Sequence, residues 1–415
     1  MKRPYVVFLC WIFACGFSLS ARAAPQIFDG ALEEVDFRAP EFPHASEAYR
    51  IEIPASPSPA GGLAPARSAS AGASAPPAAA APNSLDSNGI TWINSPPLTM
   101  RELRGKVVLI DFWEYTCINC IRTFPATKRW YARYHRYGFE VIGVHDPEFP
   151  IAYSVSNVRA AVKRFGLPWP VVVDDKFEIW NSYHSNAWPN RFLIDAKGIV
   201  RFHRAGEGGD SAFEHAIQML LQQAHPSLKF PASYVIPPET DAFAAVCRLP
   251  TSEMYVGDWG GRGILENSEG YHDRKTIDYK GSDSVQDGRV VLSGRWQTFK
   301  AGMTYRGKKN SGGGKLITRY HARQLYSVLN VERGHPSRLY ILQDGKDLTQ
   351  GNKGKDVQFD AKGRSYIEVR KSRMYYLVQN AAFGSHTVTL IPTAPGITIN
   401  SFTFGNNCQT GFPHL

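Results

Sequence analysis

The sequence predicts two folded domains of different class, an α/β domain followed by an all-β sandwich domain of jelly-roll type. From Ile90 to about Gln223, apolar β-branched runs alternate with helical patterns. Beyond Pro237 the chain consists of short alternating runs separated by Gly, Asn, Asp and Pro, which is typical of an all-β domain. The length of 415 residues leaves room for both domains and for linker sequence.

The N-terminal part has the composition of targeting and linker sequence. Two basic residues, an apolar run and the triplet Ala21-Arg22-Ala23 predict a signal peptide over residues 1–23. Residues 24–87 are expected to form an N-terminal segment and a disordered linker, because their Ala-, Pro-, Ser- and Gly-rich part buries too little apolar surface to offset its ordering entropy. Apolar positions in residues 24–53 leave open a short docking segment. The signal predicts a periplasmic or secreted protein that is soluble after cleavage.

The α/β domain is expected over residues 88–230, with strands and helices in alternation. The apolar pattern predicts strands at residues 106–113, 139–145, 171–173, 191–195 and 199–203. Helical patterns lie at about residues 120–137, 157–165 and 211–223. Such an order predicts a sheet layered between helices and ending in a hairpin and a helix.

The β-sandwich domain is expected over residues 238–415, where ten short runs extend from RVVLSG to ITINSFTF. Aromatic residues along these runs mostly alternate as core residues do, and an exposed sugar-binding face remains the alternative. These aromatic residues are Trp296, Tyr305, Tyr320, Tyr326, Tyr340, Tyr366, Tyr375 and Tyr376.

The chemistry is expected at Cys117-Ile118-Asn119-Cys120, which follows a buried strand and begins a helix. Free N–H groups and the positive end of the helix dipole stabilise a thiolate there, so we expect a lowered pKa and a nucleophilic role for Cys117. Cys120, one turn later, would resolve the mixed disulfide. A zinc site would need further ligands nearby, and c-type haem attachment would need a histidine at position 121, where isoleucine stands. A purely structural disulfide across two residues constrains little.

The remaining cysteines allow a second assignment. Cys10 and Cys15 lie in the expected signal, which leaves Cys247 and Cys408 as a pair in an oxidising compartment. They flank the β-sandwich domain, and the ends of a compact domain often lie close together, so we expect a structural disulfide between them. Two buried free thiols are the alternative.

The charge balance gives no sign of a nucleic-acid partner. The formal net charge is +10, but the basic residues are scattered and form no long run.

The segment DFWEYTCINC resembles the active-site region of the thioredoxin-like superfamily. The resemblance implies that Asp111 exchanges protons with the second cysteine, as a buried acid with a raised pKa can do. It also implies a cis-proline at Pro189 that faces the cysteines and binds substrate. The preceding residue is often small in that family, so Trp188 departs from the pattern and would narrow the choice of partner.

The resemblance extends to the soluble C-terminal part of DipZ-type proteins, which pair a thioredoxin-like domain with a sandwich resembling a carbohydrate-binding module. This resemblance extends beyond the first domain through the segments TSEMYVG, LSGRWQTF and ITINSFTFG. Since the chain lacks the multi-span electron-delivering domain of full-length members, its electron donor or acceptor is left open, and a membrane protein is one candidate.

Four further residues are candidates for lesser roles. His145 follows a strand and could lie near the cysteines, and His203 with Glu207 could form a polar cluster at the end of the hairpin. Structural histidines are the more common case. Asn119 could tune the thiolate only through hydrogen bonding.

These observations predict an exported protein-disulfide oxidoreductase that reduces or exchanges disulfides in extracytoplasmic proteins. The expected redox centre is the Cys117–Cys120 disulfide, with no further cofactor and no metal. Partners would be protein disulfides or dithiols, with glycan contact by the sandwich left open. The alternative is a glycan- or protein-binding β-sandwich module that uses the thioredoxin-like part for docking.

Overall fold

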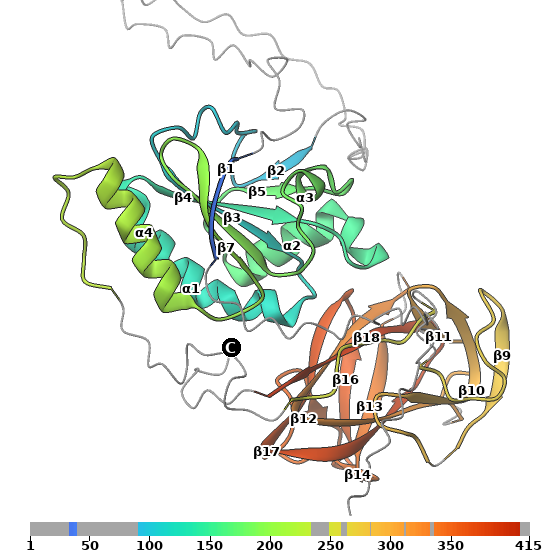
Figure 1. Ribbon diagram of the computed structural model, residues 1–415. Coiled ribbons are helices and arrows are strands. Elements are labelled where there is room, and N and C mark those ends of the chain that lie inside the picture. The colour runs from blue at the N-terminus through green and yellow to red at the C-terminus, as the bar shows by residue number, and fades with distance from the viewer. Residues whose placement is uncertain are drawn as a thin grey trace, which may run out of the picture.

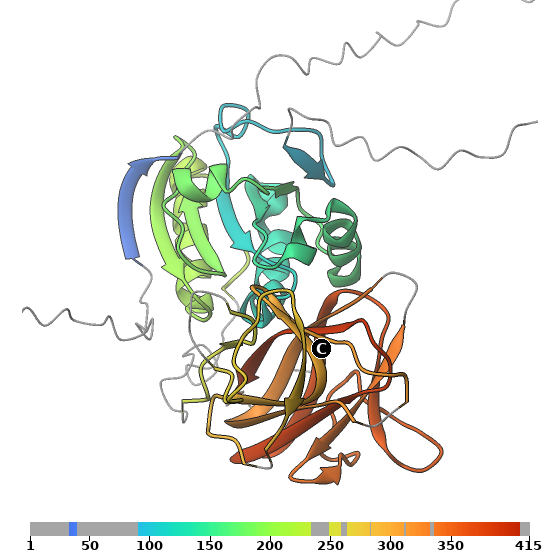
Figure 2. The ribbon, with the colours of Figure 1, turned by 90° about the vertical axis from the view of Figure 1, so that its right-hand side faces the viewer.

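The computed structural model describes residues 33–39, 90–233, 249–258, 264–282, 284–310, 313–332 and 336–406. The expected signal peptide, the Ala- and Pro-rich linker, and both Cys247 and Cys408 lie outside these ranges. The described chain forms a mixed α/β domain and an antiparallel all-β domain, which lie one above the other in Figures 1 and 2. The predicted fold class is confirmed.

The first domain is built around strand β3 (Val107–Trp113), in which all seven residues are buried. β3 runs parallel to β4 (Phe139–His145) and antiparallel to β6 (Asn190–Ile194). Its continuous apolar and β-branched sequence suits a strand covered on both faces. The remaining strands are β2 (Thr91–Ile93) and β5 (Val171–Val173) on one side, and β7 (Ile199–Ala205) and β1 (Glu33–Arg38) on the other, in the order β1-β7-β6-β3-β4-β5-β2.

Strand β1 comes from the segment that the sequence assigned to the N-terminal linker region. It pairs antiparallel with β7 and forms one edge of the sheet, where it is drawn in blue in Figure 2. Part of the expected N-terminal segment therefore belongs to the α/β domain.

Alternation along β3 divides the core of this domain between two faces. Leu109 and Trp113 pack with α1 (Ile118–Tyr134), α2 (Val155–Phe165) and α4 (Asp210–Ala224). Ile110 and Phe112 belong to a second cluster on the opposite face, which includes residues of the short helix α3 (Glu178–Ser182). Two single-turn 3₁₀ helices, η2 (His135–Tyr137) and η3 (Pro150–Tyr153), complete the helical elements.

The second domain consists of antiparallel strands that enclose one core. Its two longest strands are β12 (Lys315–Val331) and β17 (Arg373–Pro392), which pair over most of their length. A register shift in β12 near residue 323 separates the half that pairs with β10 from the half that pairs with β18. The other strands are β8 (Met254–Tyr255), β9 (Thr276–Lys280), β10 (Val290–Phe299), β11 (Gly302–Tyr305), β13 (Ser337–Gln343), β14 (Lys346–Asp347), β15 (Gln358–Phe359), β16 (Ser365–Val369) and β18 (Ile397–Gly405).

Several of the predicted short runs are joined in the structure. RVVLSG and RWQTFK form the single strand β10, which passes through Gly294. Gly294 has a φ of 79°, and a Cβ there would lie 2.3 Å from the carbonyl oxygen of Gly313, so only glycine fits. Most of the aromatic residues along these strands are buried as expected, including Trp296, Tyr320 and Tyr375.

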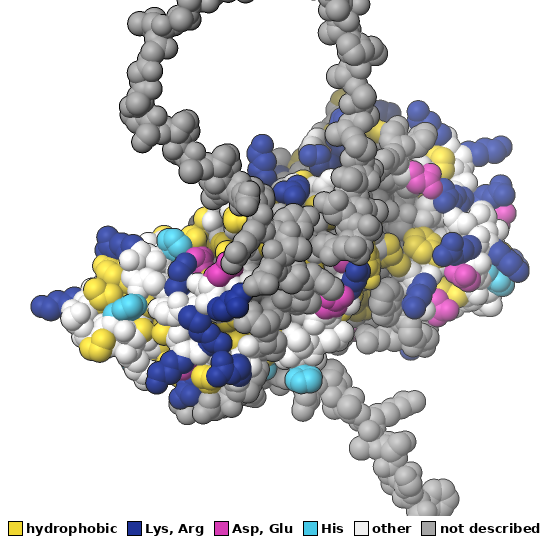
Figure 3. Space-filling model, turned by 90° about the horizontal axis from the view of Figure 1, so that it is seen from above, with side chains coloured by type: hydrophobic (Ala, Val, Ile, Leu, Met, Phe, Trp, Pro, Cys, Tyr) yellow, Lys and Arg dark blue, Asp and Glu magenta, His cyan; other side chains and the backbone are white. Residues whose placement is uncertain are grey.

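The surface shows no single basic patch on the face drawn in Figure 3, where Lys and Arg side chains are spread over both ends with acidic side chains among them. None of the helices in the described ranges combines the length and the apolar character that crossing a bilayer requires.

Candidate redox site

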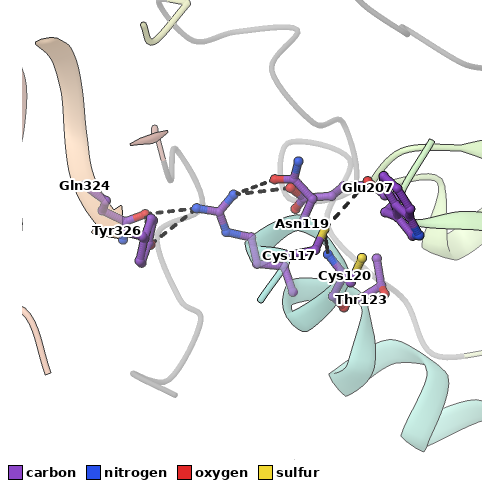
Figure 4. Close-up of polar contacts among 9 residues, drawn as sticks. Cys117, Asn119, Cys120, Thr123, Glu207, Gln324 and Tyr326 are labelled. Atoms are coloured by element: carbon purple, nitrogen blue, oxygen red, sulfur yellow. Dashed lines mark hydrogen bonds and ion pairs between the residues drawn. The ribbon is translucent and has the colours of Figure 1, made fainter. Parts of the chain in front are cut away.

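The two cysteines lie at the junction of β3 and α1. Cys117 is the N-cap of α1, and its sulfur accepts a hydrogen bond from the Cys120 N–H at 3.3 Å (Figure 4). Cys120 is fully buried one turn into the helix, whereas Cys117 is partly exposed. Both are free thiols, so the structure holds the dithiol form. The arrangement gives one accessible sulfur and one buried sulfur at the start of one helix.

Trp188 and Pro189 lie opposite Cys117. The Trp188-Pro189 peptide bond is cis. The Cys117 thiol donates to the Trp188 carbonyl over 3.7 Å. The Trp188 indole packs against Trp180, with ring centroids 4.5 Å apart. The structure thus brings the residue before the proline into contact with the first cysteine, and aromatic packing holds its side chain.

Asp111 is buried on the α1 face of β3, with 1% of its surface exposed, and it is paired in register with Arg191 of β6. Burial raises the pKa of Asp111 to about 7, and the positive charge of Arg191 opposes that rise. Its Oδ1 atom is buried without a hydrogen-bond partner in the described part of the chain. The Asp111 charge contributes to a raised pKa at Cys120, after burial and the neighbouring Cys117. A carboxyl with a pKa near 7 beside the second cysteine can take up and release a proton at neutral pH.

A second buried acid, Glu114, lies between β3 and the first cysteine, and the sequence reasoning did not single it out. Its Oε2 accepts hydrogen bonds from the Thr116 N–H at 2.6 Å and from the Thr116 hydroxyl. Its backbone carbonyl accepts from the Cys117 N–H at 3.2 Å. Burial raises the pKa of Glu114 to about 7, and the bonds from Thr116 oppose that rise. The signal was visible in DFWEYTC, where an ionisable residue interrupts a buried aromatic run.

The histidine candidates contact other groups than the cysteines. Burial lowers the pKa of His145 to about 3, so this imidazole is neutral at physiological pH. Its ring stacks on Tyr115, and its Nε2 lies 3.8 Å from Glu114 Oε1. His203 contacts the side-chain oxygen of Asn190 at 2.6 Å. Their contacts are those of packed structural histidines.

Glu207 forms an ion pair with Arg122, which also binds the second domain. Arg122 Nη1 lies 3.2 Å from Glu207 Oε1 and 3.4 Å from the side-chain oxygen of Asn119, the residue between the cysteines. Arg122 Nη2 donates to Gln324 Oε1 and to the Tyr326 hydroxyl, each at 3.3 Å (Figure 4). Only 19% of the Arg122 side chain is exposed. One guanidinium therefore links the CxxC segment, the loop after β7 and strand β12.

The second domain also approaches Cys117 through strand β8. Tyr255 of β8 donates a hydrogen bond from its hydroxyl to Glu148 Oε1, and its ring lies 5.8 Å from that of Phe149. Glu253 precedes the strand and accepts a hydrogen bond from the Thr403 hydroxyl at 2.8 Å. Tyr255 and Cys117 both pack against the core of the first domain. The all-β domain thus covers part of the dithiol site.

Because the all-β domain covers this site, the pKa of Cys117 differs from the one expected for a cysteine at an open helix N-terminus. Burial raises the pKa of Cys117, and the carboxylates of Glu148 and Glu253 raise it further, while the Cys120 N–H lowers it. The expectation of a lowered pKa was therefore wrong for this arrangement of the two domains. The hydrogen bond from the Cys120 N–H at the helix N-terminus lowers this pKa, but desolvation by burial is the larger effect.

Two family models match the chain, one over each domain. Residues 83–203 match the AhpC/TSA family. Residues 251–405 match a family described as the thioredoxin-like C-terminal domain.

Comparison with known proteins gives relatives that match most of this chain and others that match a smaller part of it. Protein DipZ of Mycobacterium bovis is 32% identical over 326 residues, which cover 77% of this chain and 42% of DipZ. The thiol-disulfide oxidoreductase ResA of Geobacillus thermodenitrificans is 33% identical over 102 residues, 25% of this chain and 56% of ResA. Among solved structures, a thiol-disulfide isomerase from Corynebacterium glutamicum is 22% identical with a TM-score of 0.29, covering 33% of this chain and 98% of that one.

The chain spans less than half the length of the DipZ proteins it matches. The matched stretch of 326 residues is longer than either domain and so includes parts of both. The comparisons therefore show an AhpC/TSA-family domain followed by a thioredoxin-like C-terminal domain, and the chain is similar to DipZ across both domains.

Proposed function

We propose that this chain is an extracytoplasmic thiol-disulfide oxidoreductase in which Cys117 is the nucleophile and Cys120 the resolving thiol. The observation that carries the proposal is the position of Cys117 as the N-cap of α1, facing the Trp188 carbonyl with Cys120 buried one turn below. Such a pair presents one sulfur to a partner and keeps the other ready for the second step. The predicted signal peptide and the relatives DipZ and ResA support action on exported proteins.

In the reducing direction, the Cys117 thiolate attacks one sulfur of a partner disulfide. The partner S–S bond breaks, a mixed disulfide forms, and the released partner sulfur takes up a proton. Cys120 then loses its proton and attacks the Cys117 sulfur, which closes the Cys117–Cys120 disulfide and releases the second partner thiol. Two electrons pass from the dithiol to the partner, and an electron donor must later restore the dithiol.

Asp111 is the group proposed to take the proton from Cys120. The raised pKa of Cys120 means that this thiol does not ionise unaided at neutral pH. With a pKa of about 7, Asp111 is ionised in a large fraction of molecules and can accept the proton. Glu114 is a second proton reservoir beside the Cys117 backbone.

Trp188 and Pro189 are proposed to bind the substrate backbone beside Cys117. The Trp188 carbonyl accepts from the Cys117 thiol, so this backbone group lies beside the attacking sulfur and can accept a hydrogen bond from a bound substrate. The indole of Trp188 narrows the space on that side of the site.

A docking role alone accounts for fewer of these features. A scaffold has no need for a buried acid beneath a buried cysteine, and the stability cost of burying two carboxyls is explained by a role in the chemistry.

The proposal is tested by insulin reduction with a chemical reductant as electron donor. We expect wild type to accelerate the reaction and Cys117→Ser to abolish that acceleration. Cys120→Ser should instead accumulate mixed disulfides with proteins from a periplasmic extract, because the attacking sulfur remains and the resolving one is gone. Cys117→Ser is the matched control for this trapping. Equal trapping by both variants would mean that the nucleophile is assigned to the wrong cysteine, and full activity of Cys117→Ser would refute the proposal.

The direction of electron flow is tested by equilibrating the dithiol with mixtures of reduced and oxidised glutathione whose redox potential is known. A reductase of this kind should reach half-oxidation at a potential near that of thioredoxin, at about −270 mV, whereas a strong oxidant would do so near about −120 mV.

A further inference from the structure

The helices of the first domain face the all-β domain in Figures 1 and 2. A pocket of about 500 Å³ is lined by residues of both domains. Its apolar lining comes from both domains: Ile121 and Phe124 of α1, Phe165 at the end of α2, and Met374 of β17. This volume falls within the range of small-molecule sites, which are frequent at domain interfaces. The pocket is separate from the Cys117 sulfur but borders the same helix, since Ile121 directly follows Cys120.

The charged residues at this pocket are mostly basic. Lys128, Arg164, Lys355 and Arg373 line it, with Asp356 as the one carboxylate among its lining residues. Asp356 is already engaged, because it forms a two-point ion pair with Arg373 at 2.7 and 2.9 Å. The pocket therefore retains an excess of positive charge around an apolar floor.

Arg164 is one of the basic residues of this pocket for which the described chain supplies no ion pair. Its guanidinium lies over the Phe165 ring, 4.4 Å from the centroid, and it forms no ion pair with any residue that the structure describes. Partial desolvation and the neighbouring charge of Arg373 lower the pKa of Arg164, with Tyr376 and Asp356 opposing that shift, so the two guanidinium groups repel each other. An anion placed between them would remove that repulsion.

We propose that this pocket binds a small amphipathic organic anion, with its carboxylate at Arg164 and its apolar part on Ile121, Phe124 and Met374. An inorganic anion would leave the apolar lining in contact with water, and a neutral apolar molecule would leave the guanidinium charges uncompensated. A guanidinium binds a carboxylate through two parallel hydrogen bonds, which suits this ligand class. Because such a ligand touches both domains, it also stabilises their packed arrangement.

The inference is independent of the redox chemistry, so it is tested by direct binding. Isothermal titration calorimetry of the mature chain with octanoate measures the affinity, and octanol and octylammonium serve as probes of equal length that differ in charge. We expect octanoate to bind at least about tenfold more tightly than octanol, as a charge-assisted hydrogen bond would give. Octylammonium should not bind measurably.

The variant Arg164→Gln separates the proposed contact from general apolar binding. Arg164 is solvent-exposed, so its replacement should leave the fold intact, which thermal unfolding checks. We expect about a tenfold weaker affinity for octanoate and no change for octanol. Lys163→Gln removes the same charge from the neighbouring exposed position of α2 and should bind octanoate as wild type does. Equal affinity of wild type and Arg164→Gln for octanoate, equal binding of octanoate and octanol, or no octanoate binding to wild type would each overturn the proposal.

Discussion

Arg122 and Tyr326 join the two domains at the redox site. The guanidinium Nη2 lies 3.3 Å from the Tyr326 hydroxyl, and its central carbon lies 5.6 Å from the centroid of that ring. The two residues are 204 positions apart in the sequence. Because Arg122 also contacts Asn119 between the cysteines, a single side chain connects the all-β domain to the CxxC segment.

Replacement of Arg122 by Gln should therefore expose the dithiol and weaken the domain contact. Loss of its charged hydrogen bonds leaves Glu207 nearly buried without its partner, and we expect the free energy of unfolding to fall by about 1 to 3 kcal/mol. Alkylation of Cys117 by iodoacetamide should become faster, because Tyr255 and its neighbours cover the sulfur less completely. Arg159→Gln, on the exposed face of α2, is the control. An alkylation rate equal to that of the control would show that the domain contact does not shield Cys117.

Replacement of Glu148 by Gln should lower the pKa of Cys117. The Glu148 carboxylate is one of the groups that raise the pKa of Cys117, so removing its charge favours the thiolate. The thiolate fraction at a fixed pH then rises. The measurement is the pH dependence of thiolate ultraviolet absorbance in a Cys120→Ser background, with Asp175→Asn as an exposed-carboxylate control. A Cys117 titration that stays at the wild-type position would contradict this assignment.

The first domain was predictable because its elements have strong local signals. The strand at residues 139–145 was placed at its observed bounds, and that at 106–113 began one residue early, since continuous apolar runs leave little choice. Strand β1 was not predictable, because six residues of mixed character become a strand only by pairing with β7 far along the chain. The length of β12 was also missed, because polar residues around a register shift divide its apolar pattern.

The residues of the site also differ in how far the sequence could predict them. Those of the local motif were predicted, and those that reach the site from the second domain were not. Cys117, Cys120 and Asp111 belong to one strand-to-helix motif, whose family resemblance also pointed to Trp188 and Pro189. Tyr255, Gln324 and Tyr326 have no such signal, since they reach the site only through the packing of the second domain. The same packing explains the wrong expectation for the Cys117 pKa, because burial by another domain is not encoded near the motif.

Replacement of Asp111 by Asn should change how stability depends on pH. The pKa of Asp111 rises from 3.8 to about 7 on folding, so the folded state binds the proton more tightly than the unfolded state. The free energy of unfolding therefore falls as pH rises through this window, by roughly 2 to 4 kcal/mol for one buried carboxyl. Asp111→Asn should lack this loss and be more stable than wild type above about pH 7.

Urea unfolding at a series of pH values measures this difference, and Asp175→Asn should follow the wild-type curve. The same Asp111→Asn variant should reduce insulin more slowly despite its stability, because the proton acceptor for Cys120 is gone. Identical stability curves for Asp111→Asn and wild type would mean that Asp111 is already ionised in the folded state at acidic pH. An unchanged turnover rate between about pH 6 and pH 9 would remove Asp111 from the proposed mechanism.

The second cysteine pair leads to the last prediction, which concerns residues outside the described ranges. Cys247 precedes strand β8 and Cys408 follows strand β18, and these two strands pair antiparallel through Met254 and Phe402. The segments before β8 and after β18 therefore begin at neighbouring strand ends, which favours a disulfide between Cys247 and Cys408. Closing a loop of about 160 residues would restrict the unfolded chain by roughly 5 kcal/mol in the loop-entropy model, an upper figure because strain and residual structure reduce it.

We expect the paired variant Cys247→Ser with Cys408→Ser to lose part of this stability, and to show no further loss when a reductant is added. Peptide mapping of unreduced protein identifies the bond directly. Recovery of both residues as free thiols, or of either one linked to Cys117 or Cys120, would exclude the pairing.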